Sequence, residues 1–321
     1  MVSLLNNKAL NKAKYSSDDT DSWFTTPEIV EQELFCYKPF FVNKRILCNC
    51  DDPIESAFTS FFVNRFDDLC LKQLIAVSYK PSKLPDSVCL NHPVLKKLRA
   101  AQSAYVLWVT PDKVSVLDAK NNGDFRLNTH LMECSDIVVT NPPFSLFRQL
   151  FHSIVEYNLD FLLLADHNAV SYKEVFPLVM NGCCRIGYHS GRKKFRVPFD
   201  SPDLTKTFVL DSQKWRSLGS AVWITSLPVD PPPPIPVFRK FDPNLYPVYD
   251  SFDAIHVDSL LNIPVDFPGV MGVPITILKK FNPNQFVLVG EANHGNSDVD
   301  LFMPTLNGKR VFKRVLIKHK L

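Results

Sequence analysis

The stretch Asp136-Ile137-Val138-Val139-Thr140-Asn141-Pro142-Pro143-Phe144 decides the fold of this chain. Its β-branched residues are typical of a buried strand, and the two prolines end it, because proline can neither donate to a strand ladder nor continue into a helix interior. The residue before a proline is held in an extended conformation, so Asn141 is fixed at the end of the strand. The sequence therefore predicts a strand at 137–140 that presents Asn141, Pro142, Pro143 and Phe144 at its carboxyl end.

The residue types at this strand end suit one kind of chemistry. An amide oxygen and a proline carbonyl can accept the two hydrogens of an amino group on an aromatic base, while a flat ring stacks on that base. The nitrogen of such a group is a poor nucleophile, and two acceptors localise its lone pair and stabilise the positive charge that develops as a methyl group arrives. We therefore take Asn141, Pro142, Pro143 and Phe144 as candidate catalytic residues. The alternative is a Pro-Pro turn that only closes a buried strand.

Strands and helices alternate around this stretch. Strands are expected at 45–50, 74–78, 105–109, 114–117 and 161–165, and helices at 27–35, 53–62, 93–101, 146–157 and 172–180. This order predicts an α/β fold, with a largely parallel, doubly wound sheet that carries helices on both faces. Past residue 183 the pattern is β-rich, with short strands expected at 185–188, 195–197, 207–210, 221–225, 285–289 and 310–317 and a stiff proline-rich connector at 230–236. We expect an N-terminal arm at 1–20, a catalytic domain at 21–228 and a C-terminal region at 229–321.

The overall charge is too mild to indicate a partner, but the basic residues are clustered. The chain of 321 residues has a formal net charge of +3. Two segments, 185–196 and 309–320, contain several Lys and Arg and no Asp or Glu. Such segments can neutralise phosphates of a nucleic acid, and the alternative for either is an ordinary solvated surface.

The cysteines and the apolar runs argue against a metal site and a membrane span. None of the eight cysteines belongs to a C-x-x-C pair, so zinc spacing is absent and a reduced, cytoplasmic compartment is the simplest interpretation. We predict no metal. The sequence shows no signal peptide and no apolar run long enough to span a bilayer, so no membrane partner is expected.

A methyl donor would have to bind beside Asn141. In doubly wound sheets ligands bind at the carboxyl ends of strands, where this chain offers Asp51 and Asp52 and, later, Asp124 and Phe125. The carboxylates suit ribose hydroxyls or an adenine amino group, and the ring of Phe125 suits an adenine face. Thr25 and Thr26 precede a predicted helix, whose N-terminus suits a carboxylate. The alternatives are a helix cap for Asp51 and Asp52 and a turn for Asp124.

The distribution of glycine excludes other nucleotide folds. The first glycine in the chain is Gly123. Neither a G-x-G-x-x-G fingerprint nor a P-loop can therefore follow the first strand, which argues against dinucleotide-dependent enzymes and kinases of those types.

Several unusual strings give the chain a recognisable family likeness. They are the stretch Asp136–Phe147, Cys48–Pro53, Gly123–Arg126, Ser171–Phe176, Gly269–Thr276 and Val315–Lys318. These strings follow one another along the chain, and from about residue 23 to its end the chain resembles the EcoRI-type adenine-specific DNA methyltransferases. The resemblance implies a Rossmann-like methyltransferase fold with a C-terminal DNA-recognition region, S-adenosylmethionine as donor and N6 of adenine in double-stranded DNA as acceptor. It also implies a monomer acting in the cytoplasm of a bacterium or encoded by a virus.

The resemblance assigns roles to residues of this chain. Asn141, Pro142 and Phe144 would hold the amino group and base, and Asn49, Asp51, Asp52, Asp124 and Phe125 would contact the donor. Phe195 is a candidate second ring on the base, with an ordinary core aromatic as the alternative. Arg192, Lys193, Lys194 and Arg196 are candidates for DNA phosphates. A stacked adenine is out of reach, so the target base must be rotated out of the duplex. The residues that read base edges are expected within 185–260.

Other functions remain open on sequence alone. An amino methyltransferase acting on RNA or on protein glutamine would use the same Asn-Pro-Pro-aromatic corner. A non-catalytic DNA-binding relative with a degenerate donor pocket is the second alternative, which the scarcity of glycine favours. A restriction nuclease is disfavoured, because no P-D-x(n)-E-x-K constellation is evident.

Overall fold

The structure, a computed structural model, describes residues 24–53, 56–78, 104–119, 124, 126, 128–197, 207–293 and 304–320. The predicted arm at 1–20, the predicted helix at 93–101 and Phe125 lie outside these residues. The chain divides into two compact units, Met1–His167 with Gly191–Trp223 and Asn168–Ser190 with Ile224–Leu321. The division after Trp223 lies close to the boundary expected at 228, but the segment 168–190 was expected in the catalytic domain and is counted with the second unit.

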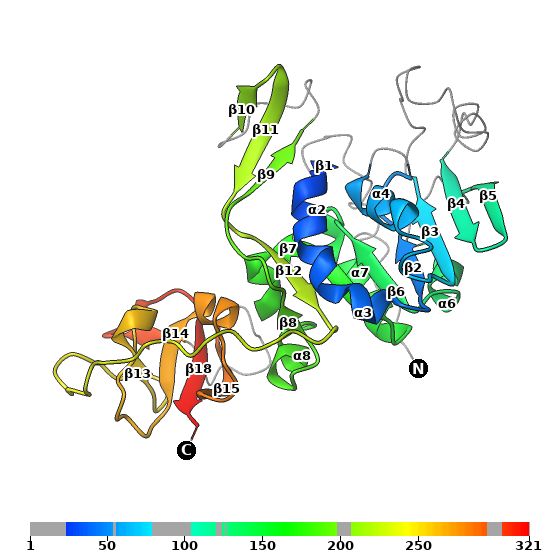
Figure 1. Ribbon diagram of the computed structural model, residues 1–321. Coiled ribbons are helices and arrows are strands. Elements are labelled where there is room, and N and C mark those ends of the chain that lie inside the picture. Colours follow the sequence, from blue (N-terminus) through cyan, green and yellow to red (C-terminus); the bar gives the residue numbers. More distant parts are fainter. Residues whose placement is uncertain are drawn as a thin grey trace, which may run out of the picture. The chain divides into compact units, whose positions relative to one another are not determined.

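The first unit is built on a mixed β-sheet (Figure 1). Its strand order is β5-β4-β3-β2-β6-β7-β12, and β8 pairs with the last two residues of β12. Neighbouring strands are parallel from β3 to β7, whereas β4 is antiparallel to β3 and forms an antiparallel hairpin with β5 at the edge. The expectation of a largely parallel sheet is therefore right for the centre and wrong for the outer strands. The bounds are β2 Arg45–Cys48, β3 Gln73–Val77, β4 Tyr105–Thr110, β5 Lys113–Asp118, β6 Ile137–Thr140, β7 Asp160–Asp166, β8 Arg185–Ile186 and β12 Ala221–Thr225.

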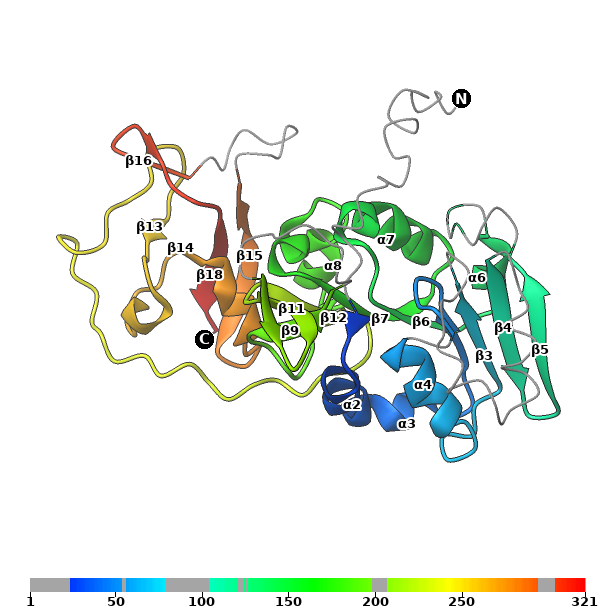
Figure 2. The same ribbon diagram turned by 90° about the horizontal axis from the view of Figure 1, so that it is seen from above.

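Helices cover both faces of this sheet, which explains its apolar composition. In β6 every residue is buried, and β2, β3 and β7 are buried except at an end. Strands buried on both faces read as continuous apolar runs. Figure 2 shows α2, α3 and α4 on one face and α7 on the other. The helices and 3₁₀ turns here are α2 Pro27–Leu34, η2 Phe35–Tyr37, α3 Lys38–Phe41, α4 Ala57–Asn64, α6 His130–Glu133, η4 Phe144–Leu146 and α7 Phe147–Glu156.

The order of the parallel strands creates a switch point between β2 and β6. From β2 the chain runs outward to β3, β4 and β5, and it then returns to β6 on the other side of β2. Asp136 holds the amino ends of these two strands together, because its carboxylate accepts the backbone N–H of Arg45 at 2.8 Å and the guanidinium at 2.6 Å. In open α/β sheets the crevice for ligands lies at such a switch point, outside the carboxyl ends of the strands.

A second sheet in the first unit pairs a strand from the start of the unit's sequence with strands from its later segment, Gly191–Trp223. Its order is β1-β9-β11-β10, with each described pairing antiparallel. Thr25 of β1 lies opposite Phe195 of β9, and Phe195 lies opposite Arg216 of β11. The strands are β1 Phe24–Thr25, β9 Lys193–Arg196, β10 Thr207–Leu210 and β11 Gln213–Leu218; β11 was not predicted from the sequence.

The second unit is mostly β-structure, as expected for the C-terminal region. One sheet has the order β13-β14-β18-β15, and β16 and β17 form a hairpin. The proline-rich connector is fixed at Ile235, whose N–H and C=O both bond the side-chain amide of Gln285 at 2.7 Å. The elements are η5 His167–Ser171, which begins at the last residue of the first unit, α8 Phe176–Met180, β13 Ile255–His256, η6 Leu260–Asn262, β14 Met271–Pro274, η7 Ile275–Lys279, β15 Phe286–Ala292, β16 Thr305–Leu306, β17 Lys309–Arg310 and β18 Arg314–His319.

Two expected elements differ from those observed in this unit. The helix expected at 172–180 covers only Phe176–Met180, and the strand expected at 310–317 is broken at 311–313 into β17 and β18. Within the described ranges, no helix is long and apolar enough to cross a lipid bilayer.

Candidate active site

The predicted catalytic tetrad lies at the carboxyl end of β6, at the switch point of the sheet. Asn141, Pro143 and Phe144 are half-buried and Pro142 is buried. The carbonyl of Pro143 accepts the N–H of Leu146 at 2.9 Å as the chain enters η4. Among the described residues no donor takes the carbonyl of Pro142. The turn therefore leaves the Pro142 carbonyl as the main-chain acceptor next to Asn141.

A hydrogen bond to Thr25 orients the amide of Asn141. Its Nδ2 donates to Oγ1 of Thr25 at 3.1 Å, across 116 positions of sequence. Thr25 is 8% exposed and is held in the second sheet opposite Phe195. Because the nitrogen end of the amide points to Thr25, its oxygen, an acceptor, points the other way. Thr25, which was predicted to contact the methyl donor, thus accepts a hydrogen bond from Asn141 in this structure.

Asp51 ties the carboxyl ends of β2 and β6 together. Its carboxylate accepts hydrogen bonds from the hydroxyl of Thr140, from the hydroxyl of Ser56 at 2.8 Å and from the backbone N–H of Asn141. Burial raises the pKa of Asp51 to about 7, and the hydrogen bonds from Thr140, Ser56 and Asn141 act in the opposite direction. Both oxygens are therefore engaged inside the protein, and Asp51 supports the catalytic turn.

Asp52 and Asn49 lie in the same loop as Asp51, but their exposure and hydrogen bonds differ from those of Asp51. The hydroxyl of Tyr105 lies 3.5 Å from both carboxylate oxygens of Asp52, which is only partly buried. Asn49 is 4% exposed, and its Nδ2 is buried without a hydrogen-bond partner in the described part of the chain. Burying an amide N–H without a hydrogen-bond acceptor is costly, so a ligand could supply the acceptor for Nδ2 of Asn49. The cap of α4 is Ser56, which accepts the N–H of Phe58 at 3.1 Å, so neither aspartate serves as the helix cap.

Asp124 and Thr26 both have partners within the protein. Asp124 is 7% exposed and forms an ion pair with Arg126, with Nη2 and Oδ2 2.5 Å apart. It also contributes to the electrostatic surroundings of Cys50, in the loop after β2, so the two segments lie close together. Thr26 precedes α2, and its hydroxyl donates to Glu28, which lowers the pKa of that carboxyl. Of the residues predicted to contact the methyl donor, Asn49, Asp51, Asp52 and Asp124 thus lie near the carboxyl ends of β2 and β6, and Thr25 is bonded to Asn141 there. The described bond of Thr26 is local.

Comparison with known proteins agrees with this geometry. A family model described as adenine-specific methyltransferase EcoRI matches residues 9–320. The type II methyltransferase M.EcoRI of Escherichia coli is 38% identical over 98% of this chain and 97% of its own length. The chain belongs to the EcoRI family of adenine-specific methyltransferases. A type II methyltransferase of Mycoplasma genitalium is 31% identical over 96% of this chain and 98% of its own, and M.MpnI of Mycoplasma pneumoniae is 29% identical over 97% and 98%. No solved structure matches the chain.

Because the chain belongs to a family of adenine-specific methyltransferases, Phe144 and Phe195 can be assessed as possible contacts of an adenine. Phe144 is half-buried at the site, so one part of its ring is accessible to an adenine. Phe195 is fully buried, but its pairing with Thr25 places it beside the residue that holds Asn141. Phe195 therefore lies next to Thr25 in the sheet, but its ring is fully buried, which is the environment of the alternative, an ordinary core aromatic.

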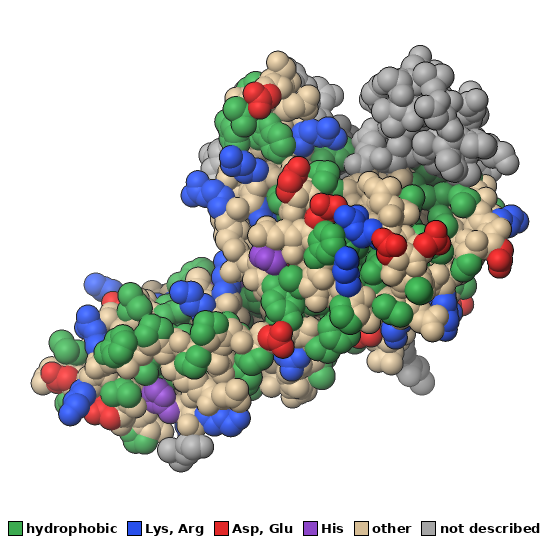
Figure 3. Space-filling view, viewed as in Figure 1, with side chains coloured by type: hydrophobic (Ala, Val, Ile, Leu, Met, Phe, Trp, Pro, Cys, Tyr) green, Lys and Arg blue, Asp and Glu red, His purple; other side chains and the backbone are tan. Residues whose placement is uncertain are grey.

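The four candidate phosphate residues do not share one environment. Side chains alternate along a strand, so Lys193 and Phe195 face one side of β9 and Lys194 and Arg196 face the other. Lys193 is 7% exposed, which does not suit a phosphate at the surface. Arg192, Lys194 and Arg196 are exposed, and Figure 3 shows Lys and Arg side chains over β9 and β11. Lys194 and Arg196 also lie over the rings of Phe208 and Phe24.

Sequence analysis missed the residues that support the site in this family member. They are Thr140 and Ser56, which bind Asp51, Tyr105 beside Asp52, Arg126 on Asp124, and Arg216 opposite Phe195. Ser56 had a signal, since a serine before the apolar run 57–62 is a typical N-cap. The others depend on pairings across the fold. Within the described ranges no group of three or more His, Cys, Asp or Glu is placed to hold a metal ion.

Proposed function

We propose that this protein transfers a methyl group from S-adenosylmethionine to N6 of an adenine that is rotated out of double-stranded DNA. The observation that carries the proposal is the amide of Asn141, oriented by Thr25 at the switch point of the sheet beside the carbonyl of Pro142. The first unit would then be a Rossmann-like methyltransferase fold, whose parallel centre and ligand crevice match this arrangement.

The residues of the tetrad account for the activation of the amino group. Oδ1 of Asn141 and the carbonyl of Pro142 accept one N6 hydrogen each, so the nitrogen lone pair is drawn out of conjugation with the ring. The same two oxygens stabilise the positive charge on nitrogen as the new bond forms, and they need no reorganisation because Thr25 and Asp51 already hold the turn. Phe144 stacks on the adenine. The surplus proton leaves to water after transfer, so no side chain has to act as a base.

The loop after β2 fits the donor that the family requires. S-adenosylmethionine carries hydroxyls, an amino group and a carboxylate, and when bound it supplies a methyl group on a positively charged sulfur. The buried Nδ2 of Asn49 matches an acceptor oxygen of the donor, and the partly buried carboxylate of Asp52 matches its ribose hydroxyls. Asp124, already paired with Arg126, would complete the polar wall of the pocket. Phe125, expected on the donor adenine, stays a prediction.

Duplex DNA explains the exposed cations near the second sheet. Arg192, Lys194 and Arg196 would contact phosphates and stabilise the distorted duplex, since rotating a base out of the stack costs a few kcal/mol. A monomer is expected from the resemblance to the family.

Incubation with tritiated S-adenosylmethionine tests the proposal. The protein is offered a library of duplexes, the matching single strands, total RNA and a mixed protein extract, and labelled nucleosides are identified after digestion. We expect label in N6-methyladenine from duplexes that share a short sequence. Label confined to RNA or protein glutamine would overturn DNA as the substrate, and binding of duplex without any transfer would indicate a non-catalytic relative.

A further inference from the structure

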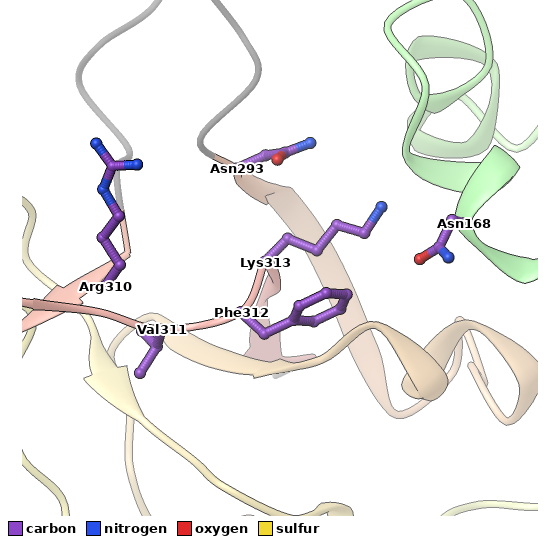
Figure 4. A pocket seen from close by; sticks show the side chains of 6 residues that line it. All are labelled: Asn168, Asn293, Arg310, Val311, Phe312 and Lys313. Carbon is purple, nitrogen blue, oxygen red and sulfur yellow. The ribbon is translucent and has the colours of Figure 1, made fainter.

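The second unit contains a polar pocket that the transfer reaction does not use. It measures about 550 Å³ and is lined by Asn168, Asn293, Arg310, Val311, Phe312 and Lys313. In Figure 4, Lys313 and Phe312 extend side by side toward Asn168. We call this site the C-terminal pocket. All six residues belong to the second unit.

The break between β17 and β18 forms one wall of the C-terminal pocket. Residues 311–313 leave the strand pattern, and the N–H of Val311 bonds the carbonyl of Pro304 at 2.8 Å. Nζ of Lys313 donates to Oγ of Ser171 at 2.5 Å, and the same hydroxyl donates to the carbonyl of Asn168 at 2.8 Å. Lys313 and Asn168 are therefore both hydrogen-bonded to the hydroxyl of Ser171, which fixes the separation of the two sides of the pocket.

The lining combines cations, amides and an exposed ring. Two side chains are cationic, two are amides and none is acidic. Phe312 is 63% exposed, so most of its side chain is accessible to a ligand. Glu291 interacts electrostatically with Lys313, and burial raises its pKa to about 7, so it opposes the positive charge of the pocket only in part at neutral pH.

This chemistry matches the edges of paired bases better than a small anion. Asn forms paired hydrogen bonds with the adenine edge and Arg with the guanine edge in the major groove, whereas a lone phosphate needs neither amides nor a ring. Arg310 and Phe312 are exposed, so a large ligand can reach them from solvent. Exposed rings next to cations are typical of protein surfaces that contact bases.

We propose that the C-terminal pocket contacts duplex DNA away from the target adenine, with Asn168, Asn293 and Arg310 reading purine edges and Lys313 and Phe312 contacting the backbone and the groove. The inference rests on the proposed function only in taking duplex DNA as the partner. It moves part of the base reading from 185–260, where the sequence led us to expect it, to residues that come together only in the fold.

Binding of the full chain to fluorescent duplexes tests the pocket. Anisotropy titrations use the duplex that is methylated fastest and an unrelated duplex of equal length. Arg310→Ala is expected to weaken binding to the first duplex by about 5- to 100-fold, the range of a bidentate base contact, and to weaken binding to the second much less. Arg310→Lys keeps the charge but loses the fork, so it should also lose the preference.

The chain offers matched controls. Lys309 precedes Arg310 on the same short strand and is exposed, but it does not line the pocket, so Lys309→Ala should bind both duplexes almost as the wild type does. Phe238→Ala removes another exposed ring, one that is 85% exposed and outside the pocket, and controls for Phe312→Ala. Thermal unfolding shows whether each variant is folded.

The outcomes separate the pocket from the proposed function. Equal effects of Arg310→Ala and Lys309→Ala would overturn the pocket as a DNA contact. Equal weakening on both duplexes would overturn base reading and indicate a phosphate contact. Competition by free adenosine monophosphate that depends on Arg310 would indicate a small-molecule site instead. If no duplex is methylated, the proposed function fails. The role of the pocket can still be decided by comparing the affinities of wild type and Arg310→Ala for any duplexes that the protein binds.

Discussion

The turn at 141–144, which we call the corner, and the C-terminal pocket both contain polar residues, but the two regions hold these residues differently. At the corner, Asn141 and Asp51 are held by hydrogen bonds from segments that lie far apart in sequence, and both are wholly or partly buried. In the pocket, Arg310 and Phe312 are exposed, and Lys313 is held by a hydrogen bond to Ser171. Charge that develops in a reaction requires acceptors already in place, whereas a groove of varying shape requires side chains that adapt.

This contrast makes different demands on each region. Substitutions at the corner should act on the rate of transfer and on the stability of the first unit. Substitutions in the pocket should act on affinity and on sequence preference. Four predictions for the corner follow, beginning with the largest effect.

Removal of the Asn141 side chain should have the largest effect. Asn141→Ala removes the amide acceptor while the turn formed by Pro142 and Pro143 remains. We expect single-turnover methylation to fall by at least about 10²–10³-fold, the usual effect of losing one group that stabilises transition-state charge. Duplex affinity should change little, because the cations on the second sheet are intact. Near-normal turnover would rule out the clamp role.

The second effect concerns Asp51 and pH. Its pKa is about 7 in the folded protein against an ordinary value of 3.8, so the folded state binds a proton more tightly than the unfolded chain does. The corresponding stability is complete below about pH 4 and is lost as pH rises through about 7, on the order of a few kcal/mol.

Asp51→Asn mimics the protonated carboxyl and titrates no longer. The difference in Tm between wild type and this variant should therefore shift against the wild type as pH rises from 4 to 8. Glu291, whose pKa is also raised to about 7, is present in both proteins and cancels in the difference. A difference in Tm that is constant with pH would show that Asp51 titrates normally.

Loss of the Thr25 hydroxyl should have a smaller effect on rate. Thr25→Val keeps the shape but removes the acceptor for Nδ2 of Asn141, so the amide is less well oriented. We expect kcat to fall about 3- to 10-fold, corresponding to one ordinary hydrogen bond, with KM for DNA nearly unchanged. Thr25→Ser retains the hydroxyl and should restore kcat. If Thr25 instead contacts the methyl donor, KM for the donor would rise and kcat would hold.

The smallest effect is expected at Ser56. Ser56→Ala removes the cap of α4 and one hydrogen bond to Asp51, which should cost about 1 kcal/mol and lower Tm by roughly 2–4 °C. Ser60, exposed on the same helix, provides the control, since Ser60→Ala should leave Tm almost unchanged. Equal Tm values for the two variants would contradict the cap role of Ser56.

Much of the corner could be predicted from sequence because its information is local. The strand at 137–140 and the turn at Asn141 follow from β-branched residues and two prolines, and the structure has both at these residues. Strands were predicted in the same way at 45–50, 105–109 and 114–117, and the structure has strands at Arg45–Cys48, Tyr105–Thr110 and Lys113–Asp118. Each depends on neighbours in sequence, so no knowledge of the tertiary fold was needed.

The rest depends on pairings that no short window contains. Asp51 was expected to face a ligand, but its partners Thr140 and Asn141 come from a different strand. Lys193 was grouped with exposed neighbours, and the alternation of β9 buries it. The run 310–317 looks like one strand, but at its break Val311 bonds Pro304 and Lys313 bonds Ser171, and neither partner is a neighbour in sequence. These differences arise where tertiary contacts override local propensity.

The two-part composition of the second unit has a consequence for how such enzymes diversify. Because it consists of Asn168–Ser190 as well as Ile224–Leu321, grafting the tail alone from a relative would separate Lys313 from its anchor Ser171. A chimera that inherits both segments keeps that anchor and leaves the loops around Asn141 untouched. Exchange of the whole second unit between lineages would then require three crossovers, after residues 167, 190 and 223, whereas exchange of the tail alone requires one.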